Sequence, residues 1–266
     1  MKSFLSMLPK EHGAWAVFFL PMAVGTVITG DPSANLLLLF FSSTGCFLTY
    51  QPLQVLYRHA ASDEKLHAAR IWSLLFLSWA AIPTLFLLIQ GFWLLLPIGA
   101  LAAASFLVTF SIIHNRPKSI ISDLEAVVGL TLTAPAAMYV LSGSLQWDAV
   151  LVWMLTALFF GSSVFYVHMK IRAFGLKKKM LTWRERFLIG YLNILYHLAV
   201  LVILITLVHT RYTPALAFVA FVPVSLHAFI GTARLSSRVG FKKLGFLLLG
   251  QSLLFAILIS LTFVGS

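Results

Sequence analysis

The chain is 266 residues long, 60% of them hydrophobic and 10% charged, and its formal net charge is +11. With a mean hydropathy of +0.96, this composition excludes a soluble globular domain, because so few charged side chains cannot cover a water-exposed surface. Excess basic residues are typical of loops that face an anionic inner leaflet. The charge therefore predicts membrane lipids as partners and no nucleic acid.

Nine apolar runs follow one another along the chain, and each approaches the roughly 20 residues that a helix needs to cross the hydrocarbon core. We expect spans near residues 13–30, 34–57, 71–90, 92–113, 120–142, 147–171, 187–208, 213–233 and 244–264. Apart from closed barrels, only helices satisfy their backbone groups in lipid. The sequence predicts an all-α polytopic membrane helical bundle of about nine transmembrane helices, as a single integral membrane domain over residues 1–266.

The basic residues alternate between loops in a way that sets the orientation. Eighteen of the 19 lysines and arginines fall on one side of the predicted membrane, and only Arg211 falls on the other. Because positive residues stay cytoplasmic during insertion, we expect the amino terminus inside and the carboxyl terminus outside a cell (inner or plasma) membrane. The single cysteine, Cys46, lies inside the second predicted span, which excludes an intramolecular disulfide.

Two helix starts show the capping-box pattern, in which a glutamate at the third helical position bonds back to the capping residue. The pattern occurs at Ser122 with Glu125, and at Thr182 with Glu185. We expect helices to begin at both places.

Polar side chains concentrate in the cytoplasmic halves of the predicted spans, where burial in lipid makes them expensive and informative. Tyr50, Gln54 and Arg58 share one face of the second helix, because residues three and four apart are neighbours on a helix. Near the end of the sixth helix, Tyr166 and Lys170 share one face, whereas His168 and Arg172 share a nearly opposite one. Only one of these two pairs can face the bundle interior.

The seventh helix contains Asn193 and His197, and the eighth contains His227. With a rise of about 1.5 Å per residue, His197 lies near the middle of the bilayer. These residues predict a polar cavity between helices that opens to the cytoplasm. The alternatives are structural: terminal lysines and arginines snorkel to the headgroups, and a membrane histidine often bonds helix to helix.

Three ionisable residues, Lys10, Glu11 and His12, stand together where the chain enters the membrane. A glutamate near a helix amino terminus is favoured by the helix dipole, which explains Glu11 without a function. His12, whose charge can change near neutral pH, is not explained in this way. If the protein is a transferase, Glu11 or His12 is the candidate acid–base residue, with Lys10 as an anion clamp.

Familiar catalytic and metal-binding motifs are absent from the sequence. It contains no glycine-rich phosphate loop, no His-Glu-x-x-His and no nucleophile elbow. His168 and Arg172 have the spacing of a metal-binding face, but arginine does not ligate metals. We predict no metal and no cofactor, and the scattered histidines leave haem as an unsupported alternative.

The opening Pro9-Lys10-Glu11-His12-Gly13-Ala14-Trp15 resembles the YwiC-like family of bacterial membrane proteins. Val164-Phe165-Tyr166-Val167, which runs into the basic end of the sixth helix, resembles the same family. The hydropathy pattern agrees with the family over the whole length. The resemblance implies a membrane protein but carries no biochemical activity with it.

A more distant resemblance is to UbiA-type prenyltransferases, which implies nine helices around a cytoplasm-facing cavity. It is carried by the stretch from Pro9 to Thr26, by Gly45-Cys46, by Asp123 to Gly143, and by the approach through Phe165-Tyr166. Both Asp-rich motifs of that superfamily are broken here. Residues 47–54 contain no acid, and Val167, His168, Lys170 and Arg172 replace the expected carboxylates. Since those carboxylates hold the Mg²⁺ that binds the diphosphate, ordinary Mg²⁺-dependent prenyl transfer is not expected.

Lys170, Arg172 and Arg58 in place of a carboxylate–Mg²⁺ shell predict direct binding of an anion, for which arginine is well suited. A lipid diphosphate or other isoprenoid anion, a quinone precursor, or a haem propionate all have this chemistry. The predicted ligand-binding residues are Lys10, Tyr50, Gln54, Arg58, Arg116, Asp123, Tyr166, His168, Lys170, Arg172, Asn193 and His197. Two alternative functions remain. One is a divergent membrane transferase that acts on a lipid or isoprenoid and uses Lys10, Glu11, His12 and Asp123 in place of the Asp-rich motifs, and the other is a small-molecule transporter.

Overall fold

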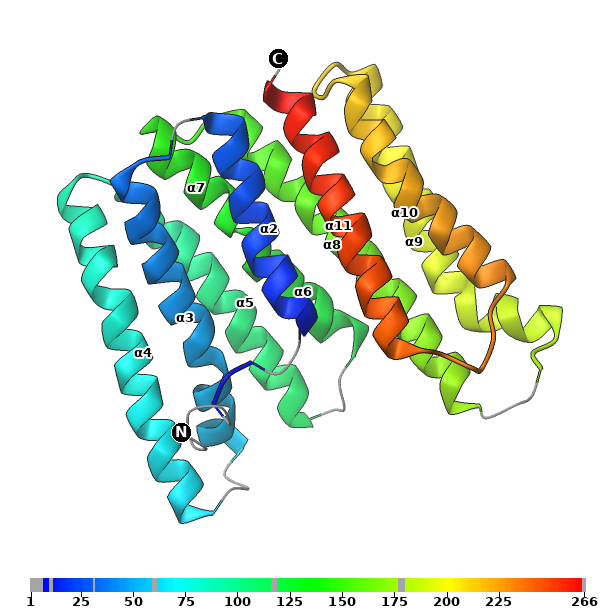
Figure 1. The fold of residues 1–266 in the computed structure, drawn as a ribbon, viewed down its shortest axis with the longest axis horizontal. Coiled ribbons are helices and arrows are strands. Elements are labelled where there is room, and N and C mark those ends of the chain that lie inside the picture. The colour runs from blue at the N-terminus through cyan, green and yellow to red at the C-terminus, as the bar shows by residue number, and fades with distance from the viewer. Residues whose placement is uncertain are drawn as a thin grey trace. The chain divides into compact units, whose positions relative to one another are not determined.

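The computed structural model describes residues 7–9, 12–30, 32–58, 62–115, 119–176 and 180–264, without the side chains of His12, Arg58 and residues 109–115. Every regular element in these ranges is a helix (Figure 1). The helices are α2 (His12–Thr29), α3 (Ala34–Arg58), α4 (Asp63–Ile89), α5 (Leu95–Asn115), α6 (Ile120–Thr131), α7 (Thr133–Ser142), α8 (Trp147–Gly175), α9 (Trp183–His209), α10 (Ala215–Ala233) and α11 (Phe241–Val264). The all-α prediction is confirmed.

Each predicted span corresponds to one helix, except the fifth span, which contains both α6 and α7. Seven spans within the described residues are long and apolar enough to cross a membrane, and the apolar stretches Gly13–Thr29 and Leu95–Val108 are shorter. Large apolar side chains such as those of Leu74, Leu85 and Val202 are exposed along these helices, as expected where the surroundings are lipid. The chain is a multi-pass membrane protein.

Two helix starts differ from the prediction. Helix α4 begins at Asp63, eight residues before the predicted span, and Asp63 and Glu64 lie in its first turn, where negative charge is favoured by the helix dipole. Helix α6 is capped by Ser119, whose hydroxyl accepts from the Ser122 amide at 3.2 Å, while Ser122 accepts from the Ser119 amide at 3.2 Å. The predicted box of Ser122 with Glu125 was therefore wrong by one turn.

The other predicted capping box is confirmed. The Thr182 hydroxyl accepts from the Glu185 amide at 3.3 Å, and the Glu185 carboxylate accepts from the Thr182 amide at 2.9 Å. These two bonds satisfy backbone donors that the first turn of α9 leaves without helical partners.

The chain divides into two compact units, Met1–Ala149 and Val150–Ser266. The first unit contains α2 to α7, and the second contains α8, except for its first three residues, with α9, α10 and α11. The prediction of a single membrane domain stays a prediction, and each unit is described by itself.

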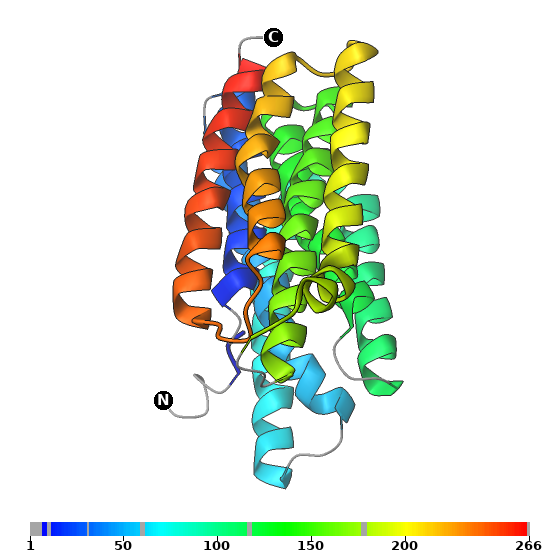
Figure 2. The same cartoon turned by 90° about the vertical axis from the view of Figure 1, so that its right-hand side faces the viewer.

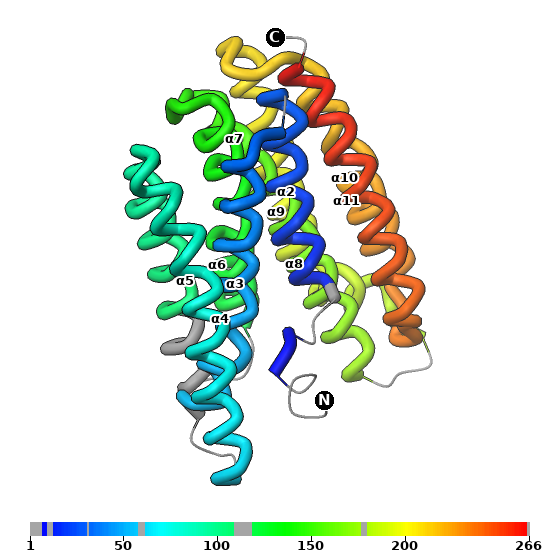
Figure 3. Tube along the Cα trace, turned by 60° about the vertical axis from the view of Figure 1, so that its left-hand side comes forward, coloured from blue at the N-terminus to red at the C-terminus, as the bar shows by residue number. Residues whose placement is uncertain are grey.

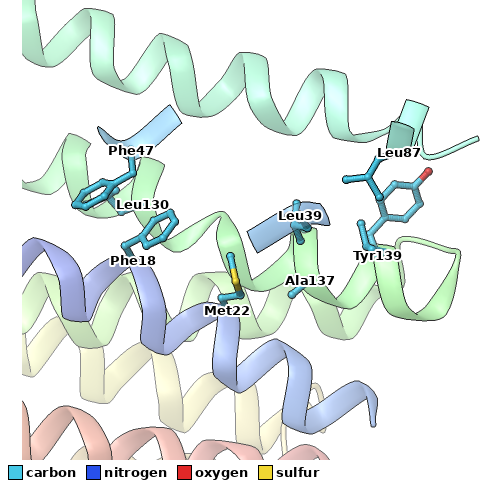
Figure 4. Close-up of a cluster of buried hydrophobic side chains, with 10 residues drawn as sticks. Phe18, Met22, Leu39, Phe47, Leu87, Leu130, Ala137 and Tyr139 are labelled. Carbon is cyan, nitrogen blue, oxygen red and sulfur yellow. The ribbon is translucent and has the colours of Figure 1, made fainter. Parts of the chain in front are cut away.

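In the first unit, α3 packs along α4, α2 packs on α6 and α7, and α5 packs on α6 (Figure 3). Gly45 allows α3 to approach α4 closely, because a Cβ there would lie 2.8 Å from the backbone of α4 at Phe76 and Ala80. A buried apolar cluster joins α2, α3, α4, α6 and α7, and within it the rings of Phe18 and Phe47 stack at 4.8 Å (Figure 4). This cluster holds the first unit together without charged groups.

In the second unit, α10 packs against both α9 and α11 (Figure 2). Aromatic rings join α8, α10 and α11: Phe255 stacks on Phe159 at 4.0 Å and meets the edge of Phe221 at 5.3 Å. All three rings are fully buried. About two turns further along α8 the packing becomes polar, and the candidate site lies there.

Candidate functional site

The site is built around Tyr166 of α8, a buried side chain that contacts two nitrogen-bearing groups. The ammonium of Lys170, one turn further along the same helix, lies 5.1 Å from the Tyr166 ring centroid, which is cation–π geometry. The imidazole of His227 on α10 lies 4.5 Å from the same ring. The His227 Nδ1 atom in turn is 3.1 Å from the amide oxygen of Gln251 on α11. One tyrosine thus connects polar groups from three helices.

Gly231 of α10 makes room for this arrangement. A Cβ atom at this position would collide with the Tyr166 hydroxyl and lie 2.7 and 2.8 Å from two ring carbons. The Gly231 carbonyl also accepts a long hydrogen bond, 3.5 Å, from the Lys170 ammonium. The position of both α8 side chains therefore depends on a residue without a side chain.

A second polar group lies between α9 and α10. The Asn193 amide nitrogen donates to the Thr232 hydroxyl at 3.0 Å and to the Ala228 carbonyl at 3.4 Å. One turn along α9, the Nδ1 atom of His197 lies 2.7 Å from the Asn193 backbone oxygen. Asn193 is 1% exposed and His197 is 0% exposed. Thr232 directly follows Gly231 in the sequence. The group around Tyr166 and the group around Asn193 therefore contact the same turn of α10.

The second unit also carries the whole net charge. Residues 150–266 contain 12 basic residues and one acidic residue, Glu185, whereas residues 1–149 contain seven of each. The Glu185 carboxylate bonds the amide and the hydroxyl of Thr182, at 2.9 and 3.1 Å. Of the basic residues, Arg186 donates to the Ala233 carbonyl at the end of α10, at 2.9 Å. The partly buried ammonium of Lys170 has no carboxylate partner among the described residues.

Comparison with known proteins gives a family match. The family model described as YwiC-like protein matches residues 8–138. Uncharacterized protein YwiC of Bacillus subtilis (strain 168) is 25% identical over 227 residues, which cover 84% of this chain and 85% of that protein. The predicted resemblance to YwiC-like proteins is confirmed. No solved structure matches this chain.

The family-model match lies in the first unit, which also contains eight of the 14 predicted site residues. Tyr50 of α3 packs against Phe106 of α5 with ring centroids 5.4 Å apart, and Gln54 and Asp123 are partly buried. Residues Lys10, Glu11 and Arg116 lie outside the described part of the chain, as do the side chains of His12 and Arg58. The proposed acid–base role of Glu11 and His12 therefore stays a prediction.

The other predicted residues lie beyond the family-model match, in the second unit. Of the two faces at the end of α8, the one with Tyr166 and Lys170 packs inward, whereas Arg172 is exposed and His168 is partly buried. The structure thus brings Tyr166 and Lys170 close to Asn193 and His197, and it leaves Arg172 on the outside. Each unit holds its own subset of the predicted site.

Sequence reasoning missed Thr232, Gly231 and Gln251. Gln251 could have been predicted from the sequence, because it is the single amide in an otherwise apolar run, and a polar residue in lipid is costly. Gly231 and Thr232 could not have been predicted, since small residues are frequent wherever membrane helices pack. Among the residues that the structure describes, no three His, Cys, Asp or Glu side chains are placed to hold a metal ion.

Proposed function

We propose that this YwiC-like membrane protein binds the anionic head of an amphipathic ligand in its second unit, at Lys170 and the polar groups around Tyr166. The supporting observation is the Lys170 ammonium, which is partly buried between apolar helices and contacts a carbonyl and an aromatic ring among the described residues. A buried charge without a counter-charge is unfavourable in lipid. An anionic ligand supplies that counter-charge.

The direction of the Lys170 side chain argues against simple snorkelling. A snorkelling lysine extends toward the nearer helix end, which here is Gly175. Instead the Lys170 ammonium lies over Tyr166, four residues closer to the middle of α8. The ammonium is therefore directed toward the middle of α8 and is partly buried.

Capping of α10 does not account for the charge either. Lys170 and Arg186 donate to the Gly231 and Ala233 carbonyls, at a helix carboxyl terminus where cations are favoured. The terminus is equivalent to only about half a negative charge, so two cations leave an excess of more than one positive charge. Arg186 makes the shorter of the two bonds, and Lys170 adds a second positive charge at the same terminus.

The anion can be a phosphate or a carboxylate, and the amphipathic classes that have one include isoprenoid phosphates, quinone precursors and haem. Mg²⁺-dependent prenyl transfer is not part of the proposal, because the second unit has a single carboxylate residue and it caps α9. A divergent transferase or a transporter is favoured by no contact in the described residues. The proposal places the basic end of the second unit on the cytoplasmic side, as the charge distribution predicts.

Lipid binding to the purified protein tests the proposal. Native mass spectrometry in mixed micelles would compare phosphatidylmethanol, a simple phosphodiester anion, with phosphatidylcholine for the wild type, Lys170→Met and Lys242→Met. Lys242 is exposed on α11, so its substitution removes the same charge away from the cluster. We expect Lys170→Met to lose the preference for the anion by about tenfold, equivalent to about 1.4 kcal/mol, and Lys242→Met to keep it.

Equal preferences in the two variants would contradict the proposal. Arg172→Met decides which face of α8 binds: a loss as large as that of Lys170→Met would place the ligand on the exposed face instead. Circular dichroism on each variant separates lost binding from lost folding.

A further inference from the structure

The contact between α9 and α10 contains three buried polar atoms without a hydrogen-bond partner in the described protein: His197 Nε2, Asn193 Oδ1 and Ser225 Oγ. Their residues are 0%, 1% and 4% exposed. Buried polar groups in proteins are nearly always hydrogen-bonded. Three such atoms on facing helices therefore point to a bound group.

The hydrogen-bonding role of His197 follows from its other nitrogen. The Nδ1 atom lies 2.7 Å from the Asn193 backbone oxygen, which can only accept. Nδ1 must therefore carry a proton, and in the neutral imidazole Nε2 then presents a lone pair. His197 Nε2 is an acceptor that needs a donor.

The role of Asn193 is fixed in the same way. The Asn193 amide nitrogen donates to the carbonyl of Ala228 and to the hydroxyl of Thr232. The Thr232 hydroxyl itself donates to the Ala228 carbonyl at 2.8 Å, so it must accept from Asn193. An amide flip would turn the Asn193 oxygen against the Ala228 carbonyl, and Oδ1 is therefore a second acceptor.

Ser225 supplies the third group. It shares a face of α10 with Ala228 and Thr232, at spacings of three and seven residues. Helices α9 and α10 are joined by the short turn 210–214 and run antiparallel (Figures 1 and 2). Asn193 lies opposite Ala228 and Thr232, so His197, one turn further along α9, lies opposite Ser225. The contact of His197 with Phe229, 6.1 Å between ring centroids, agrees with this register.

We propose that this interface is a binding site for a group that donates two O–H hydrogen bonds, to His197 Nε2 and Asn193 Oδ1, and accepts one from Ser225. A water molecule has this capacity, and about three hydrogen bonds are typical of buried waters. The vicinal diol of a hydroxylated lipid head has it too, in which case the site rests on the proposed function and makes the ligand a hydroxylated anion. Full burial restricts the bound group to a few atoms.

Nitrogen NMR of histidine-labelled protein in nanodiscs tests the site, because the shift of Nε2 differs between a free and a hydrogen-bonded lone pair. The chain has eight histidines, and His197→Phe assigns the signal of interest. Three membranes are compared: phosphatidylcholine alone, phosphatidylcholine with phosphatidylglycerol, and phosphatidylcholine with phosphatidylmethanol. The last two carry the same phosphodiester charge, but only phosphatidylglycerol offers a diol.

Two results support the site. A hydrogen-bonded Nε2 in all three membranes, with magnetisation transfer from water, identifies water as the donor. A bonded Nε2 that requires phosphatidylglycerol identifies the diol, and the fraction of phosphatidylglycerol bound should then fall about tenfold in Asn193→Leu. The binding of phosphatidylmethanol, which reports on Lys170, should be unchanged in that variant, so failure of the two proposals can be told apart.

Two other results overturn the site. A free Nε2 in every membrane means that no donor is bound. A bonded Nε2 that shows no transfer from water, is insensitive to lipid and is lost in Ser225→Ala means that the serine donates directly and no further group is present.

Discussion

Gly231→Ala is the sharpest perturbation of the polar cluster, because it adds one methyl group against Tyr166. The new Cβ would overlap the Tyr166 hydroxyl and lie 2.7 and 2.8 Å from two ring carbons. The ring as a whole must then shift, and it cannot do so without changing its contacts with Lys170 and His227. Inserting a methyl into a packed interior costs about 1–3 kcal/mol.

This cost is opposed by helix propensity, since alanine is favoured over glycine in a helix interior by about 1 kcal/mol. Gly250→Ala isolates that gain, because nothing lies within 4 Å of a Cβ at this exposed position on α11. We expect Gly231→Ala to be less stable than Gly250→Ala by about 1–3 kcal/mol. Relative to the wild type, Gly231→Ala should lie between unchanged and about 2 kcal/mol destabilised.

Reversible unfolding of both variants in detergent measures the difference, and anionic-lipid binding measures its effect on the site. Gly231→Ala should also weaken anion binding, because Lys170 loses its support on Tyr166. If the two glycine variants were equally stable and bound the anion equally well, Tyr166 would not be seated on Gly231, and the geometry of the cluster would be wrong.

Three further predictions concern packing, capping and topology. Phe159→Ala should destabilise the second unit by about 3–5 kcal/mol, because Phe159 is 1% exposed and stacks on Phe255; an unfolding free energy within 1 kcal/mol of the wild type would contradict this. Thr182→Ala should cost about 1 kcal/mol by removing the cap of α9, whereas Thr182→Ser should keep most of the stability. In a Cys46→Ser background, a cysteine at Ser236 should react with a membrane-impermeant thiol reagent only after cell lysis, and one at Tyr212 in intact cells; the reverse pattern would invert the predicted orientation.

The failed capping prediction shows where local sequence is ambiguous. Both Ser119 and Ser122 can cap a helix, and the glutamate at position 125 favoured the later start. In the structure Ser119 is the capping residue, and Ser122 takes the place of the usual glutamate at the third helical position. A serine can fill either position of the box, so the local pattern alone did not decide where α6 begins.

The sequence by itself determined the helical segments, because the thickness of the bilayer and the lack of water in it act on every residue of a span locally. It also identified Tyr166, Lys170, Asn193 and His197 as polar residues in apolar surroundings. Which face of α8 turns inward was left open, since His168 and Arg172 are as polar as Tyr166 and Lys170. The tertiary structure decided this through Gly231, because the absence of a side chain there leaves room for the Tyr166 ring against α10. The contacts with Thr232 and Gln251 were decided in the same way, since they depend on which helices are neighbours.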